Sequence, residues 1–187
     1  MNRVKKLVLS GILLAVALIL PLFTGQIPQI GKMLSPMHIP ILICGFACGW
    51  PYGLVIGAIA PILRFFIFGM PPLFPVGIAM MFELAAYGLC AGLFYKNLTK
   101  KTINIYISLL ASMLIGRIVW GTAMFVIAGI AHIEFNFHMF LAGAFINAVP
   151  GIIAHIIIIP IIIIALKKAG YIFDENLETN TPIYHRN

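Results

Sequence analysis

INIYISLLASMLIGRIVWGTAMFVIAGI, residues 103–130, is a long apolar stretch whose single charged residue is Arg117. A helix needs about 20 apolar residues to cross the hydrocarbon core of a bilayer, so this stretch predicts a membrane-spanning helix. The guanidinium of Arg117 then lies near mid-membrane, where a charge costs roughly 2.5–3.5 kcal/mol on insertion scales. Such a charge usually faces a polar interior or pairs with another group.

Three more ionisable side chains interrupt other apolar stretches: Arg64, Glu83 and His155. Together with Arg117, they give two arginines against one glutamate within the predicted membrane region. This surplus of positive charge predicts a small anionic ligand inside the bundle.

The composition excludes a water-soluble domain. Of the 187 residues, 62% are hydrophobic and 9% are charged, whereas soluble domains average about 25% charged residues. The net charge of +7 does not indicate a nucleic-acid partner, because the basic residues flank apolar stretches instead of forming one basic face. This positive-inside pattern places the flanking segments in the cytoplasm. They contain Arg3, Lys5, Lys6, Lys96, Lys100, Lys101, Lys167, Lys168 and Arg186.

The apolar stretches predict an all-α membrane protein, a six-transmembrane-helix bundle with both termini in the cytoplasm. Residues 1–170 are expected to form a single domain, and residues 171–187 a polar cytoplasmic tail. The first stretch follows a basic start, but no signal-peptidase pattern follows it, so we expect a retained helix. The six predicted helices are 7–23, 37–48, 54–68, 76–95, 103–130 and 139–166.

Glycine and proline predict the breaks between these helices. Trp50–Gly53 is expected to form a tight turn, and residues 69–75 (GMPPLFP) a loop. Pro61 is expected to interrupt its helix, and Pro150 and Pro160 to bend theirs.

Arg64 and Glu83 are both expected in the outer half of the membrane, close to the ends of their helices. Two interpretations are equally open. In the first, Arg64 anchors a ligand and Glu83 is its partner or a second contact. In the second, the two residues form a structural ion pair between neighbouring helices.

Arg117 lies too far from either helix end for its side chain to reach the interface, so we expect it to contact a ligand or Glu83. Tyr87 and Trp120 lie one helical turn from Glu83 and Arg117, where they either stack on a ligand or pack. His155 and Asn147 either contact substrate or hydrogen-bond between helices, and for His155 the interhelical role is favoured. The candidate substrate-binding residues are therefore Arg64, Glu83, Tyr87, Arg117, Trp120, Asn147 and His155.

Gly11-x-x-x-Ala15 in the first helix is a small-residue pattern that allows close helix approach in lipid. It serves either internal packing or docking on a partner. Cys44 and Cys48 are four residues apart, but no third ligand accompanies them, so no metal site is predicted. The chain contains no phosphate-binding glycine motif and therefore no nucleotide-binding machinery of its own.

The segment from residue 33 to residue 95 resembles the substrate-binding, or S, component of energy-coupling factor (ECF) vitamin transporters. The residues that carry the resemblance are Ser35–Pro40 (SPMHIP), Gly49–Gly53 (GWPYG), Pro61–Arg64 (PILR), Gly69–Pro72 (GMPP) and Phe82–Ala85 (FELA). Within the family, the chain is most similar to the pantothenate- and folate-type group.

The resemblance implies a multi-pass protein of a prokaryotic plasma membrane that binds one water-soluble vitamin from outside. It implies association with a transmembrane T protein and two ATPase subunits, which use the ATP, so this chain needs no cofactor. The family docks through Ala-x-x-x-Ala in the first helix, where this chain has Gly11 and Ala15. Pantothenate is the first expected ligand and folate the second, with Glu83 accepting a ligand hydroxyl or amide hydrogen.

Two other classes stay open at this point. An autonomous permease or channel would move its solute without ATPases, but it usually shows repeated halves and broken helices, which are not evident here. An intramembrane enzyme would use Glu83 and His155 as acid and base, but these are expected at different depths.

Overall fold

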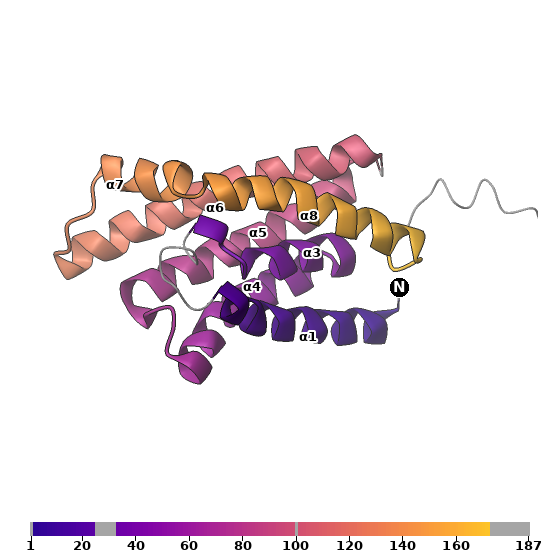
Figure 1. Cartoon of the computed structure of the whole chain (residues 1–187), viewed down its shortest axis with the longest axis horizontal. Helices are drawn as coiled ribbons and strands as arrows, with labels where there is room; N and C mark the ends of the chain where they lie inside the picture. Colours follow the sequence, from indigo (N-terminus) through magenta and orange to yellow (C-terminus); the bar gives the residue numbers. More distant parts are fainter. Residues whose placement is uncertain (1, 25–32, 100, 173–187) are drawn as a thin grey trace, which may run out of the picture.

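The computed structural model describes residues 2–24, 33–99 and 101–172, and all regular structure in these ranges is helical. Long helices lie side by side along one axis (Figure 1). Five helical stretches are long and apolar enough to cross a membrane, and a sixth is shorter. The elements are α1 (Arg3–Ile19), η1 (Leu20–Thr24), α3 (His38–Cys48), α4 (Trp50–Phe68), η2 (Leu73–Gly77), α5 (Ile78–Asn97), α6 (Thr102–Ala131), α7 (Phe137–Leu141), η3 (Ala142–Ile146) and α8 (Val149–Lys168).

The short helix α3 is the centre of the bundle. Its 11 residues give a length of about 16 Å, roughly half of the hydrocarbon core. All of them except Ile39 are buried, because α3 packs against α1, α4, α5 and α8. Figure 1 shows α3 between α1 and α8. The prediction of a helix at residues 37–48 is confirmed, and its apolar character on all sides reflects burial in protein.

Helices α3, α4 and α5 approach one another closely at glycine. A Cβ atom built on Gly53 of α4 would lie 2.6 Å from the carbonyl oxygen of Gly88 in α5. A Cβ atom built on Gly45 of α3 would lie 2.5 Å from the same oxygen. Small residues permit this approach, in which dispersion contacts replace the hydrophobic driving force that lipid removes.

The predicted tight turn at Trp50–Gly53 is wrong, because these residues form the first turn of α4. The chain turns one residue earlier, at Gly49, whose φ of 97° is readily adopted only by glycine. Pro51 is tolerated there, since the first helical turn has no use for its missing N–H. The interruption at Pro61 is also not observed, and α4 continues through it.

The later helices are irregular at the end of the bundle opposite the first turn of α1 (Figure 1). The predicted loop at residues 69–75 begins at Gly69 and includes Phe74, whose backbone is extended (φ −116°, ψ 135°) within the segment η2. Regular α-helix follows with α5, which begins at Ile78. The single helix predicted at residues 139–166 is divided into α7, η3 and α8. The division precedes Pro150, which lies in the first turn of α8 and cannot continue a helix that enters from η3. Pro160 lies inside α8.

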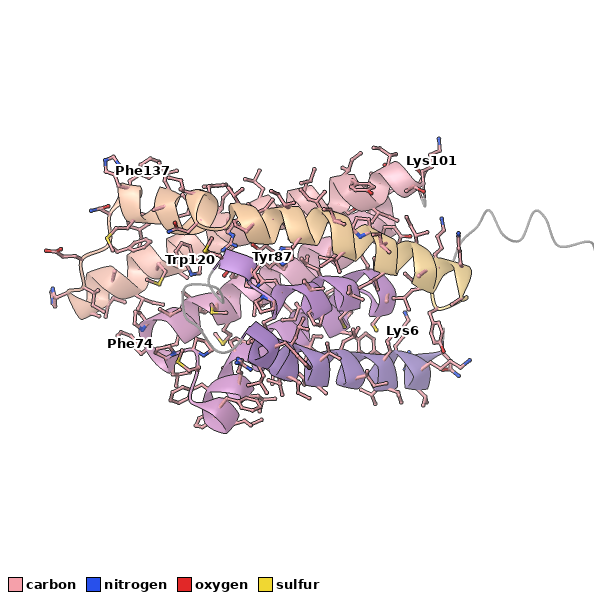
Figure 2. All side chains as sticks on the ribbon, in the orientation of Figure 1. Lys6, Phe74, Tyr87, Lys101, Trp120 and Phe137 are labelled. Carbon is pink, nitrogen blue, oxygen red and sulfur yellow. The ribbon has the colours of Figure 1, made fainter. Side chains whose placement is uncertain are left out.

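The basic residues gather at one end of the bundle. The start of α1 and the end of α8 lie at the same end (Figure 1). Lys6 and Lys101 lie there too, whereas Phe74 and Phe137 lie at the opposite end (Figure 2). This arrangement matches the positive-inside pattern, and the cytoplasmic location of the basic end stays a prediction. Most of the predicted tail, and residues 25–32 of the first predicted loop, lie outside the described residues.

Candidate functional site

Five polar side chains from four helices meet inside the bundle, and we call them the polar cluster. They are His38 from α3, Glu83 and Tyr87 from α5, Arg117 from α6, and His155 from α8. Their exposed fractions are between 1% and 9%. Ionisable groups buried to this extent in a membrane protein are costly, and they usually mark a functional site.

Glu83 is the hub of the polar cluster. Its Oε1 atom lies 2.9 Å from Nη1 of Arg117, which makes a charge-assisted hydrogen bond. Tyr87 donates its hydroxyl to the same oxygen at 3.2 Å. Nε2 of His38 lies 3.4 Å from it, although not in hydrogen-bonding geometry. One carboxylate oxygen therefore bonds α5 to α6 and lies beside His38 of α3.

The sequence around these residues explains their meeting. Glu83 and Tyr87 are four residues apart on α5 and therefore share one face of that helix. On α6, Gly116 lies directly against the Tyr87 ring, and a Cβ atom there would collide with it. Gly116 thus admits the tyrosine ring, and the next residue is Arg117, which bonds the same carboxylate.

The two histidines extend the polar cluster toward α8. The rings of His38 and His155 are stacked, with centroids 6.0 Å apart, and Tyr87 lies edge-on to His38 at 5.2 Å. The His155 ring is also hydrogen-bonded to the backbone of Ser35. His38 was not among the residues predicted from the sequence to bind substrate. It is, however, the only histidine in the apolar stretch 37–48, and this could have indicated its role.

The polar cluster retains hydrogen-bonding capacity. Four buried nitrogen atoms have no hydrogen-bond partner among the described residues, whereas buried polar atoms are nearly always paired. Each is therefore available to a molecule that enters the cluster. The four atoms are Nδ1 and Nε2 of His38, Nε of Arg117 and Nε2 of His155.

Arg64 lies apart from this arrangement. Its exposed fraction is 4%, and it donates a hydrogen bond to the carbonyl oxygen of Leu18 in the last turn of α1. Its guanidinium carbon lies 5.1 Å from the centre of the Phe68 ring. A cation near the C-terminal end of α1 is favourable. The structure therefore pairs Glu83 with Arg117, and it places Arg64 as a link between α4 and α1.

The remaining candidates lie elsewhere. Trp120 packs against Phe135 and Phe140, with ring centroids 5.9 and 6.3 Å away. Asn147 is exposed at the end of η3. The expectation that Glu83 and His155 lie at different depths is wrong, because both lie beside His38. Each lies only a few residues inside α5 or α8, since η2 and the α7–η3 segment precede these helices.

Two grooves on the bundle surface have a different character. One, of about 200 Å³, lies among η1, the segment before α3, α3 and α8, and the other, of about 370 Å³, lies between α5 and α6. Apolar side chains dominate both linings, and neither lining includes a member of the polar cluster. The five side chains of the polar cluster are buried in this structure.

The family model for the ECF transporter, substrate-specific component, matches residues 5–165. The chain belongs to this family. No curated protein and no solved structure matches the chain. ECF S components are integral membrane proteins, which agrees with the five long apolar helices. The family is one of substrate-binding transporter subunits, not of enzymes, and membership implies a small-molecule substrate and the T and ATPase subunits as partners.

The structure of this S component shows which way the small-residue pattern of α1 faces. Gly11 and Ala15 are exposed, and no described atom lies within 4 Å of a Cβ atom built on Gly11. Ser10 and Ala17 are the buried residues of α1, so its packing face lies elsewhere on the helix. Gly11 and Ala15 are therefore available to lipid or to a partner, and they do not mediate packing among the described helices.

Proposed function

We propose that this S component captures a water-soluble vitamin or vitamin precursor from outside the cell, and that the polar cluster is its recognition site. The observation that carries the proposal is that four buried nitrogen atoms of the polar cluster, around the Glu83–Arg117 pair, have no hydrogen-bond partner among the described residues. An ion pair serving structure alone would be expected to have its remaining donors and acceptors satisfied. A substrate with oxygen and nitrogen atoms supplies the missing partners.

An acidic substrate fits the donors of the polar cluster best. A guanidinium binds a carboxylate more specifically than any other side chain does, and Arg117 retains a free Nε donor. Pantothenate is the first candidate and folate the second. Mass spectrometry of small molecules that co-purify with the protein names the ligand directly, and recovery of no small molecule that binds back would contradict the proposal.

Arg117→Lys is expected to weaken binding of that ligand at least about tenfold, a loss of about 1.4 kcal/mol. Lysine keeps the positive charge beside Glu83 but lacks the planar, five-donor fork of arginine. Isothermal titration calorimetry on the purified protein measures the change in affinity. Arg3→Lys, an equivalent change at an exposed position of α1, is the matched control and is expected to bind normally. Equal affinities of the two variants would remove Arg117 from the site.

We further propose that the exposed face at Gly11 and Ala15 docks on the T subunit. Gly11→Leu combined with Ala15→Leu is expected to prevent co-purification of the T and ATPase subunits and to abolish uptake. Vitamin binding by the isolated S component is expected to persist, because no described residue packs on Gly11. Ile107→Leu combined with Leu110→Ile changes exposed positions of α6 and is the control. Assembly that survives the α1 changes would place the interface elsewhere.

A further inference from the structure

We infer that the substrate acid enters the polar cluster together with one proton, which His38 takes up. This inference rests on the proposed function of the same site. It follows from the balance of buried charge and from the position of His38 beside the carboxylate that holds Arg117.

The ligand-free cluster is electrically balanced. Arg117 contributes one positive charge and Glu83 one negative charge, and they meet at 2.9 Å. With both imidazoles neutral, the sum is zero. A carboxylate that enters without a proton leaves an excess negative charge among groups at most 9% exposed. An uncompensated buried charge of this kind is strongly unfavourable, so binding with a compensating proton is favoured.

His38 is placed to accept that proton. Its Nε2 atom lies 3.4 Å from Oε1 of Glu83, and both of its ring nitrogens lack a hydrogen-bond partner among the described residues. Once protonated, the imidazolium becomes a counter-ion of Glu83. The guanidinium of Arg117, until then held by Glu83, is free to bind the carboxylate of the substrate. The proton comes from bulk water, and the cluster stays neutral.

Among the residues that the structure describes, the helices around the polar cluster supply no other charge to balance the substrate. On α8, His155 stacks on His38 at 6.0 Å, so two adjacent imidazolium ions would repel each other and only one is expected to form. The neutral hydroxyl of Tyr87 in α5 donates a hydrogen bond to Glu83 and contributes no charge. Arg64 of α4 bonds Leu18, and the basic residues of α1 lie at its first turn, at the opposite end from Leu18.

Calorimetry in two buffers tests the inference. Pantothenate is the first probe and folate the second, titrated at about pH 8 in phosphate and in Tris, whose ionisation enthalpies differ. The wild-type protein is expected to take up about one proton per ligand, so its affinity is expected to fall as the pH rises. Panthenol, the alcohol analogue of pantothenate, is the neutral control and should show no uptake.

Two variants assign the proton. His38→Gln is expected to bind the acid without proton uptake and with weak, nearly pH-independent affinity, whereas His138→Gln, at an exposed site in α7, should behave like wild type. Glu83→Gln removes the competitor for Arg117. It is therefore expected to bind the acid more tightly than wild type at pH 8, also without uptake. If Arg117 exchanges Glu83 for the substrate carboxylate, Glu83→Gln increases the affinity. If Glu83 has only a structural role, the affinity does not increase.

The outcomes separate this inference from the function on which it rests. Acid binding without proton uptake, or uptake unchanged in His38→Gln, would overturn the inference and leave the proposed site intact. Binding of a neutral vitamin but of neither acid would also overturn it and leave vitamin capture standing. Binding that is unaffected by every change in the polar cluster would overturn both proposals.

Discussion

Glu83→Gln is expected to lower the free energy of unfolding by about 3 kcal/mol or more in the absence of ligand. The change leaves the guanidinium of Arg117, which is 9% exposed, without its counter-ion. It also weakens the acceptor of the Tyr87 hydroxyl and the contact with His38. Removal of one partner from a buried pair costs more than the pair contributes, because the other charge stays desolvated. Unfolding by dodecyl sulfate titration, followed by circular dichroism, measures the loss.

A double-mutant cycle shows whether the pair causes the loss. Arg117→Met, which removes the opposite charge at similar volume, should be destabilising alone and should recover most of the stability when combined with Glu83→Gln. Glu134→Gln, at an exposed position outside the helices, is the matched control and should change stability by less than about 0.5 kcal/mol. Additive losses in the double variant would mean that Glu83 and Arg117 do not depend on each other.

The sequence predicts the helices of this bundle well because the lipid bilayer restricts which segments can span it. A spanning segment must be apolar and long, so the stretch at residues 103–130 corresponds to α6 within one residue at each end. The failures occur at Trp50–Gly53 and at residues 142–148, where proline and glycine are compatible with more than one structure. Pro51 begins a helix, whereas Pro150 follows an irregular turn of the chain. Local composition does not distinguish these two uses of proline.

The site is predicted less completely than the fold. Charges in apolar stretches identified Glu83 and Arg117 as unusual, and the structure places them in contact. The partner of each charge depends on helix rotation and depth, which residue type does not reveal. Arg64 donates a hydrogen bond to the backbone of α1 instead of pairing with Glu83. His38 joins the polar cluster from α3, whose sequence is otherwise apolar. The short length of α3, which begins with His38 deep in the bundle, was the missing information.

Gly88→Ala is expected to lower the free energy of unfolding by about 2 kcal/mol. The new Cβ atom would overlap the backbone of Gly53, so α4 and α5 must separate instead of one side chain rotating away. Gly88 directly follows Tyr87, and this separation is therefore also expected to weaken the Tyr87–Glu83 hydrogen bond and the affinity for ligand. Detergent unfolding and ligand titration measure the two effects on the same sample.

Gly129→Ala gives the opposite expectation and makes the test decisive. Gly129 is exposed on α6, and no described atom lies within 4 Å of a Cβ atom built there. Alanine stabilises an unhindered helix position by about 1 kcal/mol relative to glycine, so this variant should be unchanged or slightly more stable. Alanine has the same helix-propensity advantage over glycine at position 88. A lower free energy of unfolding for Gly88→Ala therefore requires steric overlap that costs more than this advantage. If Gly88→Ala were instead as stable as Gly129→Ala, α4 and α5 would not touch at glycine, and the packing that positions Glu83 would need another explanation.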